Sequence, residues 1–165
     1  MNIGRLVARV LIGGLFVGHG TQKLFGWFGG PGIEGTAGMM EQLDLNPPKR
    51  NAVLAGVTET TGGALLALGL ATPLPSAALI GTMVTAIRKV HGPKGLWVTQ
   101  GGYEYNLVLI AGLLAFAQEQ PGDISLDNAL GVRLSGVVWP AAALALGVAA
   151  SEASVRIGEA QTPNT

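Results

Sequence analysis

Apolar residues fill four long stretches of the chain, and polar residues and helix breakers separate them. A helix needs about 20 predominantly apolar residues to cross the hydrocarbon core of a bilayer. The pattern predicts helical spans at residues 6–25, 52–71, 76–90 and 104–118. A fifth apolar segment at 134–150 is also long enough to span, although it contains Pro140. We expect the remaining residues, 151–165, to form a polar, frayed tail.

The connections between these segments complete the predicted topology. Gly-Gly-Pro-Gly at 29–32 ends the first span, and the segment 35–43 is too short to cross, so we expect a short interfacial helix there. Two prolines in 72–75 predict a tight turn that makes the second and third spans an antiparallel hairpin. Gly14 and Gly18 form a GxxxG pair, which permits the close approach of another helix. The sequence thus predicts an all-α integral membrane protein of one domain: a four-helix transmembrane bundle, a short interfacial helix and an additional C-terminal apolar helix.

Composition supports a membrane protein with several spans. Of 165 residues, 48% are hydrophobic and 12% are charged, which is about half the charged fraction of a typical soluble domain. The mean hydropathy is +0.44, and the 26 glycines follow no fixed period, which excludes a collagen-like chain. The amino-terminal segment, with Arg5 and Arg9 before an apolar stretch, has features of a signal peptide. It is long enough to span and lacks a small-x-small cleavage pattern, so we expect it to be retained as the first helix.

The same composition limits the chemistry of the chain. The formal net charge is zero, so nothing indicates a nucleic-acid partner. The absence of cysteine excludes disulfides, thiolate nucleophiles and cysteine-ligated iron–sulfur clusters. With two histidines, His19 and His91, we expect no protein-only metal site. A haem bound between them is disfavoured because His91 lies at the predicted membrane interface.

One acidic residue, Glu59, lies inside the otherwise uncharged apolar run 52–71. A carboxylate at this depth is expensive in hydrocarbon, so it should face the interior of the bundle and have a partner or a proton. With a rise of about 1.5 Å per residue, Glu59 lies about 10 Å and His19 about 9 Å from the same membrane surface. Lys23 lies one turn closer to that surface. Small residues share the helical face of Glu59, so we expect this face to pack against another helix.

Two further charged residues lie on the same side of the predicted bundle, Arg88 near the end of the third span and Glu104 at the start of the fourth. The candidate ligand-binding residues of a polar cavity on this side are His19, Lys23, Glu59, Arg88 and Glu104. Glu59 is the candidate proton acceptor, and the sequence identifies no catalytic residue. Simpler interpretations stay open. Lys23 and Arg88 could extend to lipid headgroups, and His19 could bond a backbone carbonyl. Glu104 could be a first-turn acid favoured by the helix dipole, and Glu59 could form a purely structural ion pair.

Ordered motifs across most of the chain are similar to those of the DoxX family. They are the run from Gly18 to Leu24, Glu59 followed by the glycine pair at 62–63, the run from Gly101 to Asn106, and Ser125-Leu126-Asp127. The resemblance covers residues 3–127 and implies a small multi-pass helix bundle of the bacterial inner membrane, associated with redox chemistry. Related proteins are described as subunits of a thiosulfate:quinone oxidoreductase, or as membrane partners of superoxide dismutase and a sulfurtransferase in an oxidative-stress complex. The resemblance carries over no catalytic residue.

Three functions follow as hypotheses. The first is a redox-associated membrane subunit, not self-sufficient as an enzyme, whose cavity binds a quinone-like or other small hydrophobic ligand. Glu59 would accept a proton, and His19 or Lys23 would donate to a carbonyl. The second is a non-catalytic anchor that recruits soluble antioxidant or sulfur-transfer enzymes through the loops 29–50 and 92–103. The third is a small-molecule or proton-coupled transporter, which the lack of an internal repeat disfavours. Membrane lipid, proteins of a membrane redox complex and a second copy of the chain are the expected partners.

Overall fold

The computed structural model describes residues 2–161, and within this range the chain is all-α. The longer helices are α1 (Ile3–Phe25), α2 (Gly32–Gln42), α3 (Pro48–Leu68), α4 (Pro73–Ala86), α5 (Glu104–Gln118) and α7 (Val138–Ala160). The shorter ones are η1 (Trp27–Gly29), the π-helical turn η2 (Ile87–His91), η3 (Gly92–Lys94), η4 (Val98–Gln100) and α6 (Leu126–Leu130). The all-α prediction is therefore confirmed for the described residues.

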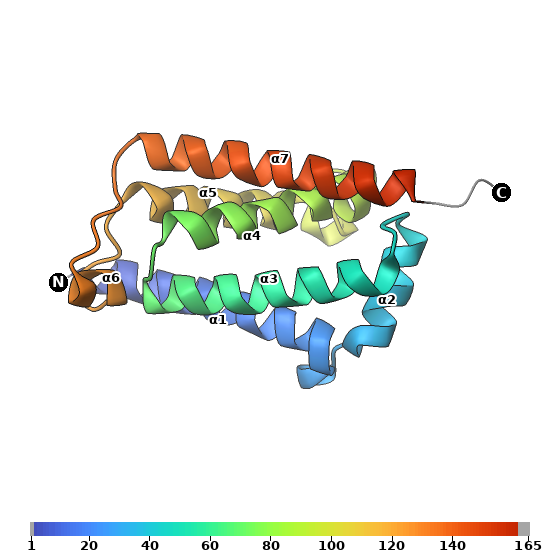
Figure 1. The fold of residues 1–165 in the computed structure, drawn as a ribbon, viewed down its shortest axis with the longest axis horizontal. Coiled ribbons are helices and arrows are strands. Elements are labelled where there is room, and N and C mark those ends of the chain that lie inside the picture. The colour runs from blue at the N-terminus through green and yellow to red at the C-terminus, as the bar shows by residue number, and fades with distance from the viewer. Residues whose placement is uncertain (1, 162–165) are drawn as a thin grey trace.

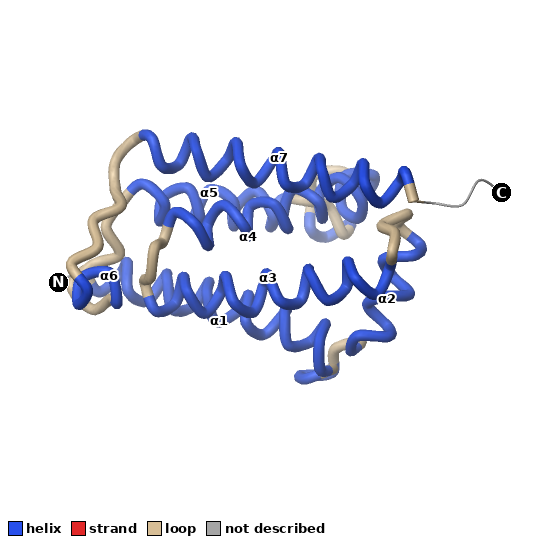
Figure 2. Tube along the Cα trace, viewed as in Figure 1, coloured by secondary structure: helices blue, strands red, loops and turns tan. Residues whose placement is uncertain are grey.

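The long helices form two layers that run side by side (Figure 1). One layer consists of α1 and α3, which pack against each other along most of their length, and the other consists of α4, α5 and α7. The α3–α4 hairpin joins the two layers. The loops gather at the two ends of the bundle (Figure 2), with α6 at one end and α2 crossing the other, where it contacts both α1 and α3.

Two hydrophobic clusters hold the layers together at different heights. The larger one lies toward the α6 end and includes Leu66 of α3, Leu79 of α4 and Leu113 of α5. The smaller one lies at the α2 end and consists of Met40, Leu45, Ala52 and Val155. Because the second cluster joins the α2–α3 region to the C-terminal half of α7, the two layers are closed at both ends.

A buried polar group fastens the α6 end of the bundle. Arg9 and Asp127 are 1% and 0% exposed. Arg9 donates from Nη2 to the carbonyl of Ile124 at 2.6 Å, and the backbone N–H of Ala71 donates to Asp127 Oδ1 at 2.8 Å. Ile124, just before α6, is therefore tied to α1, and Asp127 of α6 is tied to the α3–α4 turn. This explains how a five-residue helix keeps a fixed position.

The predicted tail at 151–165 is wrong over its described part, because α7 continues without a break to Ala160. Residues of this part are buried, Ser151 and Val155 among them. Ion pairs with the π-helical turn that follows α4, in the same layer, hold it as well: Glu152 lies 2.7 Å from Arg88. Packing and paired charges thus stabilise a helix that its polar composition alone does not predict. The last four residues of the predicted tail, 162–165, lie outside the described residues.

The other predicted segments are found with shifted ends, and the fourth, 104–118, coincides with α5. Within residues 2–161, two helices, α1 and α7, are long and apolar enough to cross a membrane. They correspond to the first predicted span and to the fifth apolar segment. α3 carries Glu59 and several threonines, while α4 and α5 have 14 and 15 residues, fewer than the roughly 20 of a typical span. Length and composition therefore identify two candidate spans among the described residues.

Glycines allow α1 and α3 to approach closely. A Cβ atom on Gly13 would lie 2.5 Å from the carbonyl oxygen of Gly63, and one on Gly20 would lie 2.6 Å from that of Gly56. These two contacts are seven residues apart on α1, so they lie on one face two turns apart. The predicted GxxxG pair, Gly14 and Gly18, does not make this contact, since a Cβ atom there would meet nothing within 4 Å. The pair lies on another face of the helix.

The difference in packing between Gly13 and Gly14 allows a matched test of the contact between α1 and α3. Gly13→Ala forces α1 away from α3, and overpacking of this kind costs about 1–3 kcal/mol. Gly14→Ala adds the same methyl group in open space and should leave stability unchanged or raise it slightly, because alanine is the better helix former. Thermal unfolding in detergent micelles, followed by circular dichroism, compares the two. Equal stability of both variants would contradict the packing described here.

Candidate functional site

A cavity of about 730 Å³ lies between the two layers, and we call it the interlayer cavity. Small-molecule sites in proteins occupy roughly 300–1,000 Å³. Its walls come from α1, α2, α3, α4, η2, α5 and α7. Most of the lining is apolar and includes Leu15, Phe16, Met40, Met83 and Leu109. A few polar side chains interrupt this apolar surface, and they decide what chemistry the cavity offers.

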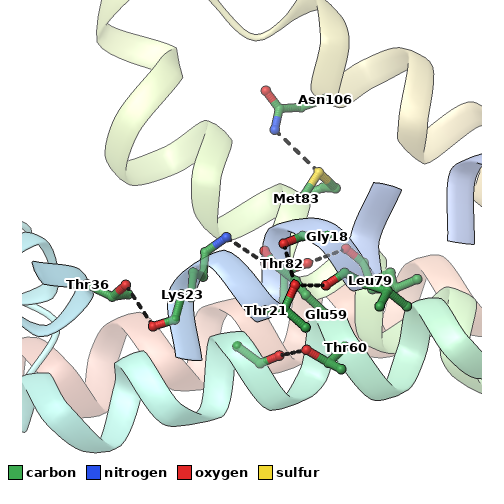
Figure 3. Close-up of polar contacts among 12 residues, drawn as sticks. Gly18, Thr21, Lys23, Thr36, Glu59, Thr60, Leu79, Thr82, Met83 and Asn106 are labelled. Carbon is green, nitrogen blue, oxygen red and sulfur yellow. Dashed lines mark hydrogen bonds and ion pairs between the residues drawn. The ribbon is translucent and has the colours of Figure 1, made fainter. Parts of the chain in front are cut away.

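The strongest polar feature of the interlayer cavity is an ion pair between Lys23 of α1 and Glu59 of α3. The Lys23 Nζ lies 2.6 Å from Glu59 Oε2, and the two side chains are 20% and 7% exposed (Figure 3). Lys23 starts one turn above Glu59, but side chains in a helix lean toward its N-terminus. The lysine therefore reaches down α1 to the carboxylate, which has the partner that its burial requires.

The backbone around Lys23 is fixed by α2. Thr36, which is fully buried, donates from its hydroxyl to the carbonyl of Gly32 at 2.7 Å and lies 3.3 Å from the carbonyl of Lys23. Figure 3 shows this threonine next to the end of α1. Gly26 ends α1 in the left-handed conformation, with φ of 72°. The chain can therefore turn directly after Lys23 and bring α2 back over the helix end.

Of the five predicted site residues, three come together. His19 lines the interlayer cavity with Lys23 and Glu59. It is exposed toward the cavity side of α1, and its imidazole has no hydrogen-bond partner among residues 2–161. The prediction of a satisfied, packed histidine therefore does not describe it. A free imidazole beside an ion pair can donate or accept a hydrogen bond from a ligand.

The other two predicted site residues, Arg88 and Glu104, do not line the interlayer cavity. Arg88 belongs to the π-helical turn η2 and points to α7, where its Nη1 lies 2.7 Å from Glu152 Oε2. Glu104 is the first residue of α5, and its backbone N–H donates to the carbonyl of Leu96 at 2.8 Å. Its position matches a first-turn acid favoured by the helix dipole. The structure therefore brings His19, Lys23 and Glu59 to one cavity and places Arg88 and Glu104 outside it.

Several polar residues of the cavity were not among the predicted ones. Thr85 of α4 and Ser151 of α7 are joined by a hydrogen bond of 2.9 Å between their hydroxyls. Asn106 of α5 is buried, and its amide nitrogen donates to the sulfur of Met83 at 3.4 Å (Figure 3). His91 of η2 also lines the cavity. The spacing of Ser151 and Ser154 on one helical face was the available signal, but it lay in the segment predicted to be frayed.

The arrangement suits a small apolar molecule with a polar end. The ammonium of Lys23 has three hydrogens and uses one on Glu59, so it can donate to a ligand oxygen while Glu59 accepts. Within residues 2–161, no three histidine, cysteine, aspartate or glutamate side chains are grouped so that they could hold a metal ion. The chemistry that the site offers is therefore hydrogen bonding and proton transfer in an apolar setting.

The ion pair gives a test of what holds the site together. Lys23→Met leaves the buried carboxylate of Glu59 without its partner, and such a loss costs about 3–5 kcal/mol. The double variant Lys23→Met/Glu59→Leu removes both charges and should recover most of that stability. Chemical denaturation in micelles measures all three proteins. A double variant as unstable as Lys23→Met would show that the pair does not carry the interaction.

Comparison with known proteins assigns the chain to a family. A family model described as DoxX matches residues 4–92, which include His19, Lys23 and Glu59. Searches of the curated proteins and of the solved structures gave no match. The matched segment covers more than half of the chain and runs from the start of α1 to the end of the π-helical turn. The chain therefore belongs to the DoxX family, whose proteins are associated with membranes.

Proposed function

We propose that this protein is a multi-pass helix bundle of the bacterial inner membrane whose interlayer cavity binds a small hydrophobic molecule of the quinone type. The observation that carries the proposal is the Lys23–Glu59 pair, a donor and an acceptor of protons set into a largely apolar cavity. A quinone ring needs an apolar surface for its body, and its carbonyl needs a donor. The interlayer cavity provides both the apolar surface and the donor.

The outer surface of the bundle supports a membrane position. Large apolar side chains are exposed on α1, α5 and α7, among them Leu11, Val108 and Leu146. Trp27 and Phe28 are exposed directly after α1, where aromatic residues typically mark the headgroup level. α3 can lie in the bilayer despite Glu59, because this side chain is buried against the neighbouring helices. We therefore propose that α1, α3, α4, α5 and α7 lie in the bilayer.

The proposed role in redox chemistry is that of a binding subunit. Lys23 donates to a carbonyl oxygen of the ligand, His19 supplies a second hydrogen bond, and Glu59 holds or releases a proton at that oxygen. The chain has no cysteine, so electrons must come from a partner protein and not from a thiol of this chain. In a membrane redox or oxidative-stress complex, this chain would bind the ligand and a partner protein would supply the electrons.

The proposal is tested with Glu59→Gln and a matched control, Glu104→Gln, an acid of the same bundle that does not line the cavity. We expect Glu59→Gln to weaken the binding of a decyl-tailed quinone about tenfold, because Lys23 loses the carboxylate that positions its ammonium to donate to the quinone carbonyl. Glu104→Gln should bind like the wild type. Equilibrium dialysis against micelle-solubilised protein measures the affinities.

Normal quinone binding in Glu59→Gln would remove the assignment of the site. If the wild type binds no quinone and still co-purifies soluble antioxidant enzymes, the anchor function replaces the binding function. In that case changes in the loop that contains Trp97 should abolish co-purification, while Glu59→Gln leaves it intact.

A further inference from the structure

His91 occupies a second polar position in the interlayer cavity, on the layer that faces Lys23. It is the last residue of the π-helical turn η2, and its Nδ1 lies 2.8 Å from the carbonyl oxygen of Gly101. A carbonyl oxygen can only accept a hydrogen bond, so Nδ1 must carry the hydrogen. In the neutral ring the other nitrogen, Nε2, then has a free lone pair and is an acceptor.

Three glycines allow the backbone conformation that positions the imidazole of His91. The backbone N–H of Gly92 closes the π turn on the carbonyl of Ile87, and a Cβ atom on Gly92 would lie 2.6 Å from that oxygen. Gly101 has φ of 78°, a conformation that presents its carbonyl to His91 at little cost only for glycine. Gly102 is buried against the backbone of Leu96, where no side chain fits. The ring orientation of His91 is therefore fixed by the local backbone.

The π turn also decides which side chains enter the cavity. Three consecutive residues, Lys89, Val90 and His91, line it, whereas Arg88 points outward to Glu152. The wider turn brings successive side chains closer in direction than an α-helix does, and π turns occur frequently at functional sites. Lys89 is already paired, with its Nζ 2.9 Å from Glu159. Nε2 of His91 is thus one acceptor of this wall, beside the amide of Asn106 and the hydroxyls of Thr85 and Ser151.

The two walls of the cavity present different hydrogen-bonding groups to a ligand. On one wall, Lys23 donates and Glu59 accepts. On the other wall, His91 accepts. A ring with two carbonyl groups has acceptors only, so it satisfies Lys23 and leaves Nε2 of His91 without a hydrogen. A ring with two hydroxyl groups satisfies both walls, because each hydroxyl both donates and accepts.

We propose that His91 contacts the ligand by accepting a hydrogen bond from a hydroxyl group, and that the interlayer cavity therefore prefers the reduced, dihydroxy form of its ligand over the dicarbonyl form. This inference rests on the proposed function, since it concerns the same cavity. It assigns a second binding residue and the redox state of the bound molecule. Sites built to bond a hydroxyl reject analogues that lack it, because a polar group of the protein is then left unpaired.

The test compares a decyl-tailed hydroquinone with the matching quinone, both under argon, on micelle-solubilised protein. We expect the wild type to bind the hydroquinone about tenfold more tightly, the equivalent of one hydrogen bond. His91→Phe should reduce this preference to within about twofold and leave the quinone affinity unchanged, since it removes the acceptor and keeps a flat ring. Lys94→Gln, a change in the adjacent turn η3 outside the cavity, should keep the wild-type preference.

A second readout measures binding on the wild-type protein. The chain has two histidines, so ¹⁵N-histidine spectra contain two rings, and a spectrum of His19→Phe assigns them. Hydroquinone should shift the Nε2 signal of His91, and quinone should not. Equal affinities of the wild type for both molecules, or an unshifted Nε2 signal with bound hydroquinone, would overturn this inference and leave the proposed function standing. Absence of binding of either molecule to the wild type would instead overturn the proposed function.

Discussion

The buried ion pair between Lys23 and Glu59 is the constraint on which the rest of the structure depends. A carboxylate that is 7% exposed in the middle of α3 needs a cation within hydrogen-bond distance, and the ammonium at 2.6 Å provides it. This contact requires α1 and α3 to run antiparallel at close range, which the glycines at positions 13, 20, 56 and 63 permit. It also requires α1 to end directly after Lys23, where Gly26 turns the chain.

Once α1 and α3 are fixed in this way, the second layer cannot follow them closely along its whole length. Apolar clusters join the layers at the two ends, and the polar residues of both walls face one another between them. The cavity is thus a consequence of packing two layers around side chains that cannot be buried in apolar contact. Glu59 on one wall and His91 on the other keep the two layers apart. The same two side chains can form hydrogen bonds with a ligand.

The sequence predicted what periodicity and the cost of burial control. The helical segments follow from the apolar stretches and the breakers between them. The burial of Glu59 near His19 and Lys23 follows from an acid in an apolar run. Arg88 could not be placed, because the π turn that aims it at Glu152 is not visible in a hydrophobic pattern. The helical state of 151–161 was missed for a related reason: its stability comes from partners distant in the sequence. His91 depends on a carbonyl ten residues away and was hidden in the same way.

The most direct test of the central claim, that a ligand enters between the two layers beside the ion pair, is photolabelling in native membranes. An azido derivative of a decyl-tailed quinone is activated by light, and the labelled peptides are identified by mass spectrometry. The account predicts labels on cavity residues such as Phe16, Met83 and Leu109. Labels confined to the outer faces, on Leu11 or Val108 for example, would show that the molecule only touches the lipid-facing surface and would contradict the account.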